Sequence, residues 1–148
     1  MNDFDNKKEW KLTKKVLPQH TDHAGVLWHG TYFNFLEEAR IDALNRAGIP
    51  YSKLSREGIE IPLISAQIKY KISFLHGEDI LLISQFKFVN KIRFKCRTLF
   101  LKSNSIIGAE AIIEVIFVRK QNDSIKILRQ LPVAIKNSLL ILEEGPKN

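Results

Sequence analysis

The densest group of chemically capable side chains in the sequence lies between residues 20 and 32, where three of the four histidines, two threonines and an aspartate occur together. The run is His20-Thr21-Asp22-His23-Ala24-Gly25-Val26-Leu27-Trp28-His29-Gly30-Thr31-Tyr32. Three kinds of role suit these residue types: a turn or helix cap, a metal site, and acid–base or nucleophilic catalysis.

In the first interpretation, Asp22 or Thr21 is a turn or capping residue and the histidines are solvated. In the second, His20, Asp22, His23 and His29 hold a metal, although their spacing matches no zinc signature. In the third, Asp22 is an acid, base or nucleophile beside a helix N-terminus, where unpaired N–H groups stabilise developing negative charge. The residues alone leave all three interpretations open.

A long helix is predicted to follow this group, over residues 32–47. Apolar residues recur there at three- and four-residue steps, which places them on one helical face. They are Tyr32, Phe35, Leu36, Ala39, Ala43 and Leu44. Gly48 and then Pro50 provide the usual C-terminal stop.

Beyond residue 60 the hydrophobic period changes to two, which indicates strands. Residues 64–72 alternate apolar and polar side chains, so we expect one buried face formed by Ile64, Ala66, Ile68, Tyr70 and Ile72. Residues 92–100 repeat the pattern, and residues 80–89 form a more apolar strand between them. The last long strand spans 106–118, and its end, 116–118, is apolar on both faces, as expected of a central or interface strand.

With a first strand near residues 8–17, the order is one strand, an irregular segment, one helix and four strands. This order predicts an α+β fold in which an antiparallel sheet packs one long helix against one face. After Leu131-Pro132 we expect only a short terminal segment, with a frayed polar tail at 143–148.

Length and composition favour one globular domain over residues 1–148, with its core at about 8–140. The chain has 148 residues, 45% of them hydrophobic, and no sign of a linker or repeat. One cysteine, Cys96, excludes an intrachain disulfide and cysteine-based metal or redox motifs. The charged N-terminus and the lack of a long apolar run lead us to expect a cytoplasmic protein without membrane insertion.

The formal net charge of +7 makes polyanions plausible partners, including nucleic acid, acidic membrane or a phosphorylated small molecule. The basic residues are scattered, and no nucleic-acid-binding motif accompanies them, so we expect no nucleic acid partner. The seven glycines never take the spacing of dinucleotide, P-loop or serine-hydrolase motifs, which excludes those enzyme classes.

The run Thr21-Asp22-x-x-Gly25-x-x-x-His29-x-x-Tyr32, followed by Phe35-Leu36-Glu37-Glu38-Ala39-Arg40, resembles the signature of hotdog-fold acyl-CoA thioesterases of the 4-hydroxybenzoyl-CoA thioesterase family. Pro62-Leu63, His76-Gly77-Glu78-Asp79 and Leu131-Pro132 extend the likeness over about residues 8–140. The resemblance implies a hotdog fold, in which a five-stranded antiparallel sheet wraps around one long central helix.

The resemblance further implies an enzyme that hydrolyses an acyl-CoA thioester to a free acid and CoA, without a metal or another cofactor. Asp22 would be the catalytic nucleophile or general base, and the backbone N–H of His29 would polarise the thioester carbonyl. The His29 side chain would orient the substrate or assist the leaving group. Some hotdog thioesterases use a helix carboxylate instead, but we expect Glu37 and Glu38 to be solvated or to lie at an interface.

Substrate contacts are expected at Gly25, Gly30, Thr31 and Tyr32, although Tyr32 on the apolar helix face also suits a core position. CoA carries phosphates, and Arg93 and Lys95, with Arg97 on the same strand face, are candidates to bind them. A solvated strand face explains these basic residues equally well.

Members of the family pair edge to edge and form active sites at the dimer interface, so we expect a homodimer or homotetramer. The acyl group stays open, with 1,4-dihydroxy-2-naphthoyl-CoA as a specific subcase. Two alternatives remain: a hotdog hydratase or dehydratase that uses His29 with a carboxylate, and a non-catalytic acyl-CoA-binding protein.

Overall fold

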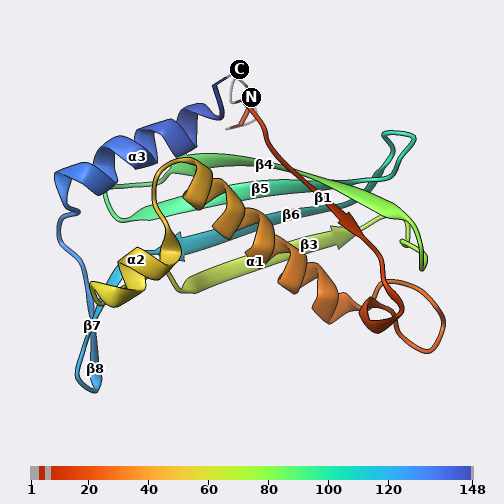
Figure 1. Cartoon of the computed structure of the whole chain (residues 1–148), viewed down its shortest axis with the longest axis horizontal. Helices are drawn as coiled ribbons and strands as arrows, with labels where there is room; N and C mark the ends of the chain where they lie inside the picture. The colour runs from red at the N-terminus through yellow and green to blue at the C-terminus, as the bar shows by residue number, and fades with distance from the viewer. Residues whose placement is uncertain (1–3, 6–7, 148) are drawn as a thin grey trace.

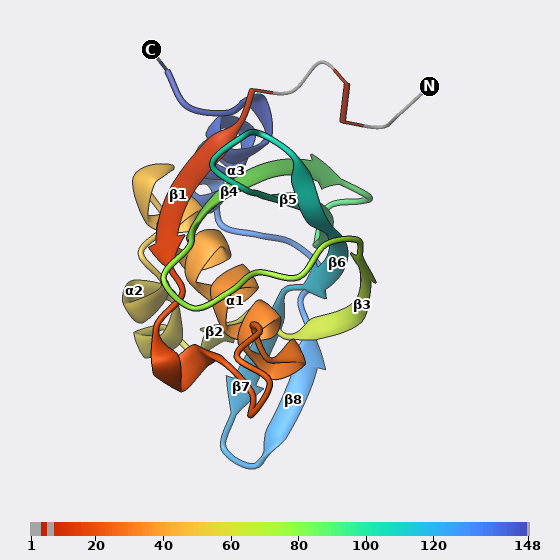
Figure 2. The same ribbon diagram turned by 90° about the vertical axis from the view of Figure 1, so that its right-hand side faces the viewer.

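The computed structural model describes residues 4–5 and 8–147. Its main layer is a five-stranded sheet in the order β1-β4-β5-β6-β3, and all neighbouring strands are antiparallel. The strands are β1 (Trp10–Lys15), β3 (Leu63–Tyr70), β4 (Asp79–Phe88), β5 (Arg93–Leu101) and β6 (Ile107–Ile116). The sheet curves around α1 (His29–Arg46), as Figures 1 and 2 show. The predicted α+β hotdog architecture is therefore confirmed.

Helix α1 begins three residues before the predicted start and ends one residue before the predicted end. Its buried face contains the apolar residues that the periodicity selected, together with Thr31 and Arg40. After the helix, Gly48 takes a φ of +95°, a left-handed conformation that favours glycine and ends the helix where expected.

The core lies between α1 and the concave face of the sheet. On β5, Phe94, Cys96, Thr98 and Phe100 are all buried, which confirms the alternation predicted for residues 92–100. Strand β6 lies between β5 and β3, so it is a central strand of the sheet. Phe117, just beyond the end of β6, is fully buried. The predicted strand 106–118 is therefore central as far as Ile116, while Val118 already begins a strand of a second sheet.

Strand β3 departs from the prediction of a buried face. Only Ile68 is even partly buried, while Ile64 and Tyr70 are 45% and 54% exposed and Ile72 beyond the strand is 45% exposed. The physical reason is that β3 is an edge strand, paired with β6 on one side only among the described residues.

Four further elements were not predicted. They are α2 (Tyr51–Arg56) and a small antiparallel sheet in the order β2-β7-β8, made of β2 (Ile59–Glu60), β7 (Val118–Gln121) and β8 (Ser124–Ile127). Within the described residues, none of the helices is long and apolar enough to cross a membrane.

The terminal segment that follows Leu131-Pro132 is helix α3 (Val133–Glu144), so the predicted fraying was wrong for residues 143–144. Its residues Ile135, Leu139 and Leu142 are buried, and the Trp10 indole N–H donates to the Leu142 carbonyl at 2.9 Å. The Glu143 carboxylate accepts the Phe88 N–H, which ties the end of α3 to β4. This packing leaves residues 143–144 in an ordered helix. Residue 148 of the predicted tail lies outside the described residues.

Candidate active site

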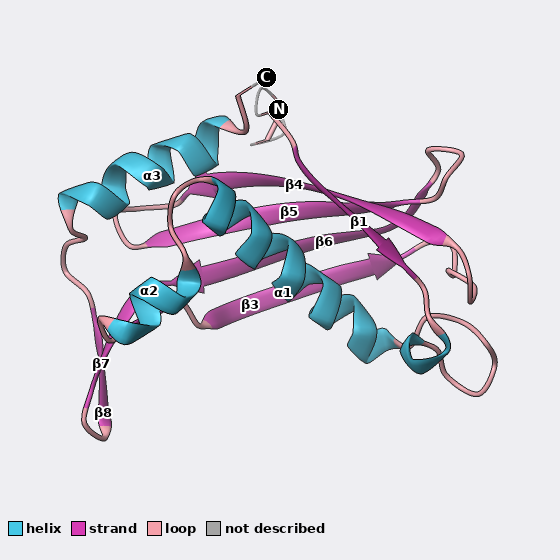
Figure 3. Ribbon diagram, in the orientation of Figure 1, coloured by secondary structure: helices cyan, strands magenta, loops and turns pink. Residues whose placement is uncertain are grey.

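The loop that precedes α1 folds back on itself as a small hairpin (Figure 3). After β1, a 3-10 turn (Pro18–His20) leads into it. The N–H of Asp22 donates to the Val26 carbonyl at 2.9 Å, and the N–H of Trp28 donates to the His20 carbonyl at 2.9 Å. These bonds place the turn that carries Asp22 directly ahead of the first turn of α1.

The Asp22 carboxylate stabilises this turn. Its Oδ1 accepts the N–H of Ala24 at 2.8 Å and the N–H of Val26 at 3.4 Å, an Asx-type arrangement. The turn interpretation of Asp22 is therefore correct as far as Oδ1 is concerned. Its second oxygen, Oδ2, has no partner among the described residues and is free for other chemistry.

Gly25 is required for the shape of this turn rather than for close packing. Its φ is +78°, and an added Cβ would meet no described atom within 4 Å. The left-handed backbone alone therefore favours glycine here.

At the start of α1, the N–H groups of His29 and Gly30 have no acceptor among the described residues. Such unpaired N–H groups carry the positive end of the helix dipole. The next residue fixes their position, because the buried Thr31 hydroxyl donates to the His20 carbonyl at 3.0 Å. A Cβ at Gly30 would overlap the ring of the half-exposed Trp28, so a larger residue there would have to displace that ring.

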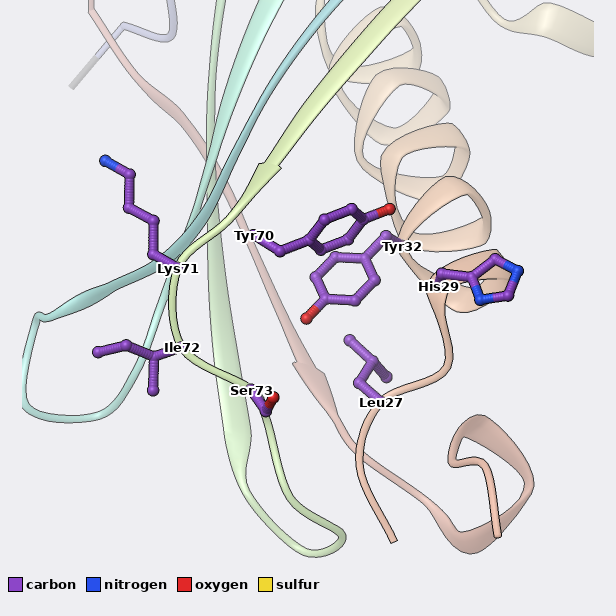
Figure 4. Close-up of a pocket in the computed structure, with 7 residues that line it drawn as sticks. All are labelled: Leu27, His29, Tyr32, Tyr70, Lys71, Ile72 and Ser73. Carbon is purple, nitrogen blue, oxygen red and sulfur yellow. The ribbon is translucent and has the colours of Figure 1, made fainter. Parts of the chain in front are cut away.

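A pocket of about 250 Å³ lies between this helix start and the segment that follows β3 (Figure 4). Its lining residues are Leu27, His29, Tyr32, Tyr70, Lys71, Ile72 and Ser73. No local pattern marks Tyr70, Lys71, Ile72 and Ser73 as site residues, since only the packing of β3 beside α1 brings them to the pocket. Asp22 is not among the lining residues, and neither are Gly25, Gly30 and Thr31.

Aromatic rings form the inner wall of the pocket. Tyr32 is only 4% exposed and packs edge-on against Tyr70, with ring centroids 4.9 Å apart. The centroid of the Tyr32 ring also lies 5.2 Å from that of Phe100 and 6.5 Å from that of Phe74. Burial, with a smaller contribution from Tyr70, raises the pKa of Tyr32 to about 12.

The histidine side chains are dispersed. The His29 ring contacts Trp28 at 4.8 Å and points away from both tyrosines in Figure 4. The Nδ1 of His20 accepts the Leu17 N–H at 3.0 Å, and His23 is exposed. Among the described residues, no three His, Cys, Asp or Glu side chains gather where they could hold a metal ion.

The basic strand residues lie far from the pocket in a single chain. Phe100, whose ring contacts Tyr32, lies seven residue steps along extended β5 from Arg93, which corresponds to roughly 23 Å. Arg93 pairs with Glu114 at 2.6 Å, so its charge is already compensated within the sheet. Lys95 is also near the distant end of β5, while Lys71 is the one lysine that lines the pocket.

The two helix glutamates predicted to be solvated or at an interface pair with basic residues. Glu37 pairs with the buried Arg40 at 2.5 Å, and Glu38 pairs with Lys14 at 2.7 Å. Both carboxylates are about half exposed; they line a separate hollow between α1 and the start of α2 and not the pocket at the N-terminus of α1.

The curved sheet around one helix, with a pocket at the helix N-terminus, is the architecture of a thioesterase family. The sequence matches the thioesterase-like superfamily over residues 16–139, and the chain belongs to this family. Sequence comparison finds the candidate esterase sll0410 of Synechocystis sp., 28% identical over 142 residues, which cover 93% of this chain and 82% of that protein.

Two solved structures share the fold. The 1,4-dihydroxy-2-naphthoyl-CoA thioesterase Slr0204 from Synechocystis has a TM-score of 0.80 at 17% identity, covering 91% of this chain and 95% of that one. The 4-hydroxybenzoyl-CoA thioesterase from Pseudomonas sp. strain CBS-3 has a TM-score of 0.79 at 14% identity, and the match covers 88% of this chain and 99% of that one. At these identities the likeness concerns the fold.

Proposed function

We propose that this protein hydrolyses acyl-CoA thioesters, with Asp22 as the catalytic carboxylate and the N–H of His29 as the donor to the thioester carbonyl oxygen. The observation that carries the proposal is the unpaired N–H at the start of an 18-residue helix, at the wall of a pocket and beside the Asp22 turn. Family membership supports thioester hydrolysis as the reaction.

The reaction needs a group that delivers an oxygen to the thioester carbon and a donor that stabilises the resulting oxyanion. Asp22 can attack the carbon directly, so that the C–S bond breaks and water later hydrolyses the mixed anhydride. It can equally take a proton from an attacking water. In both routes CoA leaves as a thiolate, which is a good leaving group, so a carboxylate and an N–H donor suffice without a third residue.

The orientation of His29 favours hydrolysis over the hydratase alternative. A hydratase would need the imidazole at the reacting carbons, whereas the ring points away from the pocket tyrosines and packs at a tilt against the Trp28 ring. His29 lines the pocket, and its backbone N–H, at the first residue of the helix, is the group that we propose as the donor.

We further propose that two chains pair through the free edge of β3 and complete the site. Strand β3 exposes the apolar side chains of Leu63 and Ile64, and the pocket opens at its end, where Tyr70 and Ile72 lie. Pairing would cover these side chains and add a second chain to the rim of the pocket. Assembly into a tetramer would build on this dimer.

For the CoA phosphates we retain Arg93 and Lys95 as the proposed contacts. Gly25, Gly30 and Thr31 would act through the backbone geometry of the turn and the helix start rather than by side-chain contact. We also propose a cytoplasmic location, where acyl-CoA substrates would be available.

The test is release of free CoA thiol from a panel of acyl-CoAs, including short-chain, long-chain, benzoyl, 4-hydroxybenzoyl and 1,4-dihydroxy-2-naphthoyl thioesters. A hydrolase releases thiol in proportion to the acid formed. A hydratase would change enoyl or hydroxyacyl thioesters without releasing thiol, and a binding protein would change none. Either of these two outcomes would overturn the proposal.

A further inference from the structure

The hydroxyl of Tyr32 is an unpaired polar group within an aromatic wall. Tyr32 is 4% exposed, yet its hydroxyl has no hydrogen-bond partner among the described residues. The side chain nevertheless lines the pocket, and Figure 4 shows the hydroxyl directed into it. The hydroxyl is not one of the buried side-chain atoms that lack a partner, so it is accessible from the pocket. A ligand that covers it must supply a hydrogen-bond partner or leave the hydroxyl buried and unpaired at a free-energy cost.

The direction of the hydroxyl identifies the part of a substrate it would meet. In Figure 4 it points away from α1, toward Ile72 and Ser73, whereas the hydroxyl of Tyr70 points toward the helix. A thioester whose carbonyl oxygen is held at the His29 N–H would extend its acyl group from the helix toward the segment after β3. The Tyr32 hydroxyl therefore faces the acyl group rather than the carbonyl oxygen.

We propose that Tyr32 is a specificity-determining residue whose hydroxyl donates a hydrogen bond to an oxygen on the acyl group, so that the preferred substrates are compact acyl-CoAs bearing a hydroxyl or oxo group. This inference rests on the proposed function. The pocket volume of about 250 Å³ lies below the roughly 300–1,000 Å³ of sites for drug-sized ligands, which favours a compact acyl group.

Selectivity would come from the penalty on the wrong substrate. An acyl group of the same shape without the oxygen would displace solvent from the pocket and leave the phenol unpaired. Sites built to hydrogen-bond a substrate group reject analogues that lack it far more strongly than apolar pockets reject size changes. The raised pKa of Tyr32 keeps the phenol protonated, and thus a donor, at neutral and moderately alkaline pH.

The experiment compares kcat/KM for matched substrate pairs, 3-hydroxybutyryl-CoA against butyryl-CoA and 4-hydroxybenzoyl-CoA against benzoyl-CoA. The wild type should prefer the oxygenated member of at least one pair by about tenfold or more. Tyr32→Phe retains the ring and removes the hydroxyl, so it should reduce that preference to within about threefold. Most of the change should be a lower kcat/KM on the oxygenated substrate.

Tyr51→Phe is the matched control, because it removes a phenol that bonds Glu60 outside the pocket. It should leave the preference as in the wild type. Thiol release with an unchanged preference in Tyr32→Phe would overturn the inference while leaving the proposed function intact. Loss of the preference in Tyr70→Phe but not in Tyr32→Phe would also overturn it. A wild type that hydrolyses no thioester would reject the proposed function itself, and this inference with it.

Discussion

The Thr31 hydroxyl, in the first turn of α1, donates to the carbonyl oxygen of His20 at 3.0 Å. This bond joins the helix start to the base of the loop that carries Asp22. Two groups that are seven residues apart in sequence, the Asp22 carboxylate and the His29 N–H, are therefore held on one connected unit. Such fixed positioning is what catalysis by a pre-oriented carboxylate and N–H donor requires.

The pair His29→Phe and His29→Pro separates the backbone from the imidazole. His29 is the first residue of α1, where proline fits, and Trp28 before it is extended with φ −70° and ψ 142°, as a residue before proline must be. His29→Phe keeps the N–H and should retain activity within about tenfold, while His29→Pro removes the N–H and should lose about 10²–10³ in kcat.

Circular dichroism and solution mass show whether each His29 variant is folded. A well-folded His29→Phe variant that loses about 10³ or more would place the imidazole in the mechanism and favour the hydratase alternative. Near-normal turnover by a folded His29→Pro variant would show that the backbone N–H of His29 takes no part in catalysis.

Gly25→Ala tests the turn. Because φ at Gly25 is +78° with open space around it, alanine should cost about 1 kcal/mol of unfolding free energy through backbone strain alone. Gly77→Ala is a matched control, with φ +89° and likewise nothing within 4 Å of an added Cβ. Urea titration should show similar losses for both, but only Gly25→Ala should reduce turnover. Equal turnover of the two variants would contradict a role for the geometry of the Asp22 turn in catalysis.

Ile64→Lys tests the proposed dimer. Ile64 is 45% exposed on the edge strand β3, where a lysine should oppose strand pairing. Light scattering should give at least twice the 17.1 kDa of one chain for the wild type and a large single-chain fraction for this variant. Ile125→Lys, on β8 and 68% exposed, should keep the mass of two chains or more. A wild type with the mass of one chain at micromolar concentration would contradict pairing through β3.

Stability should fall at alkaline pH because of Cys96. Burial raises the pKa of this thiol from 9.0 to about 11. Between about pH 9 and 11 the unfolded chain has released the thiol proton and the folded chain has retained it, so the free energy of unfolding decreases as pH rises. Urea midpoints at pH 8 and pH 10.5 should differ more for the wild type than for Cys96→Ala. The same difference in both proteins would contradict this origin.

Local patterns in the sequence predicted much of this fold. The three- and four-residue spacing from Tyr32 to Leu44 marks one helix face, and the alternation around Phe94 and Phe100 marks a strand with one buried side, because both patterns depend on backbone geometry alone. Helix α3 carries the same kind of signal in Ile135, Leu139 and Leu142, so this helix was also predictable from the sequence.

Features set by tertiary packing could not be predicted. The alternation in β3 identifies a strand, but its burial depends on what lies beside the edge of the sheet. The Asp22 turn and the start of α1 are near in sequence, so their association was predictable. Tyr70 and Ser73 line the pocket only because β3 lies beside α1. Arg93 lies far from the pocket because it is at the opposite end of the nine-residue strand β5.

The most direct test of the account is thiol release by Asp22→Asn on the best acyl-CoA of the panel. Asparagine retains an oxygen that can accept the N–H groups of Ala24 and Val26, so the turn should persist while the carboxylate is lost. Asp79→Asn, which removes a carboxylate from a surface pair with Lys15, is the control. We predict that Asp22→Asn loses about 10²–10⁴ in kcat with an unchanged fold, and that Asp79→Asn stays near the wild type. Turnover near the wild-type rate in folded Asp22→Asn would contradict the account.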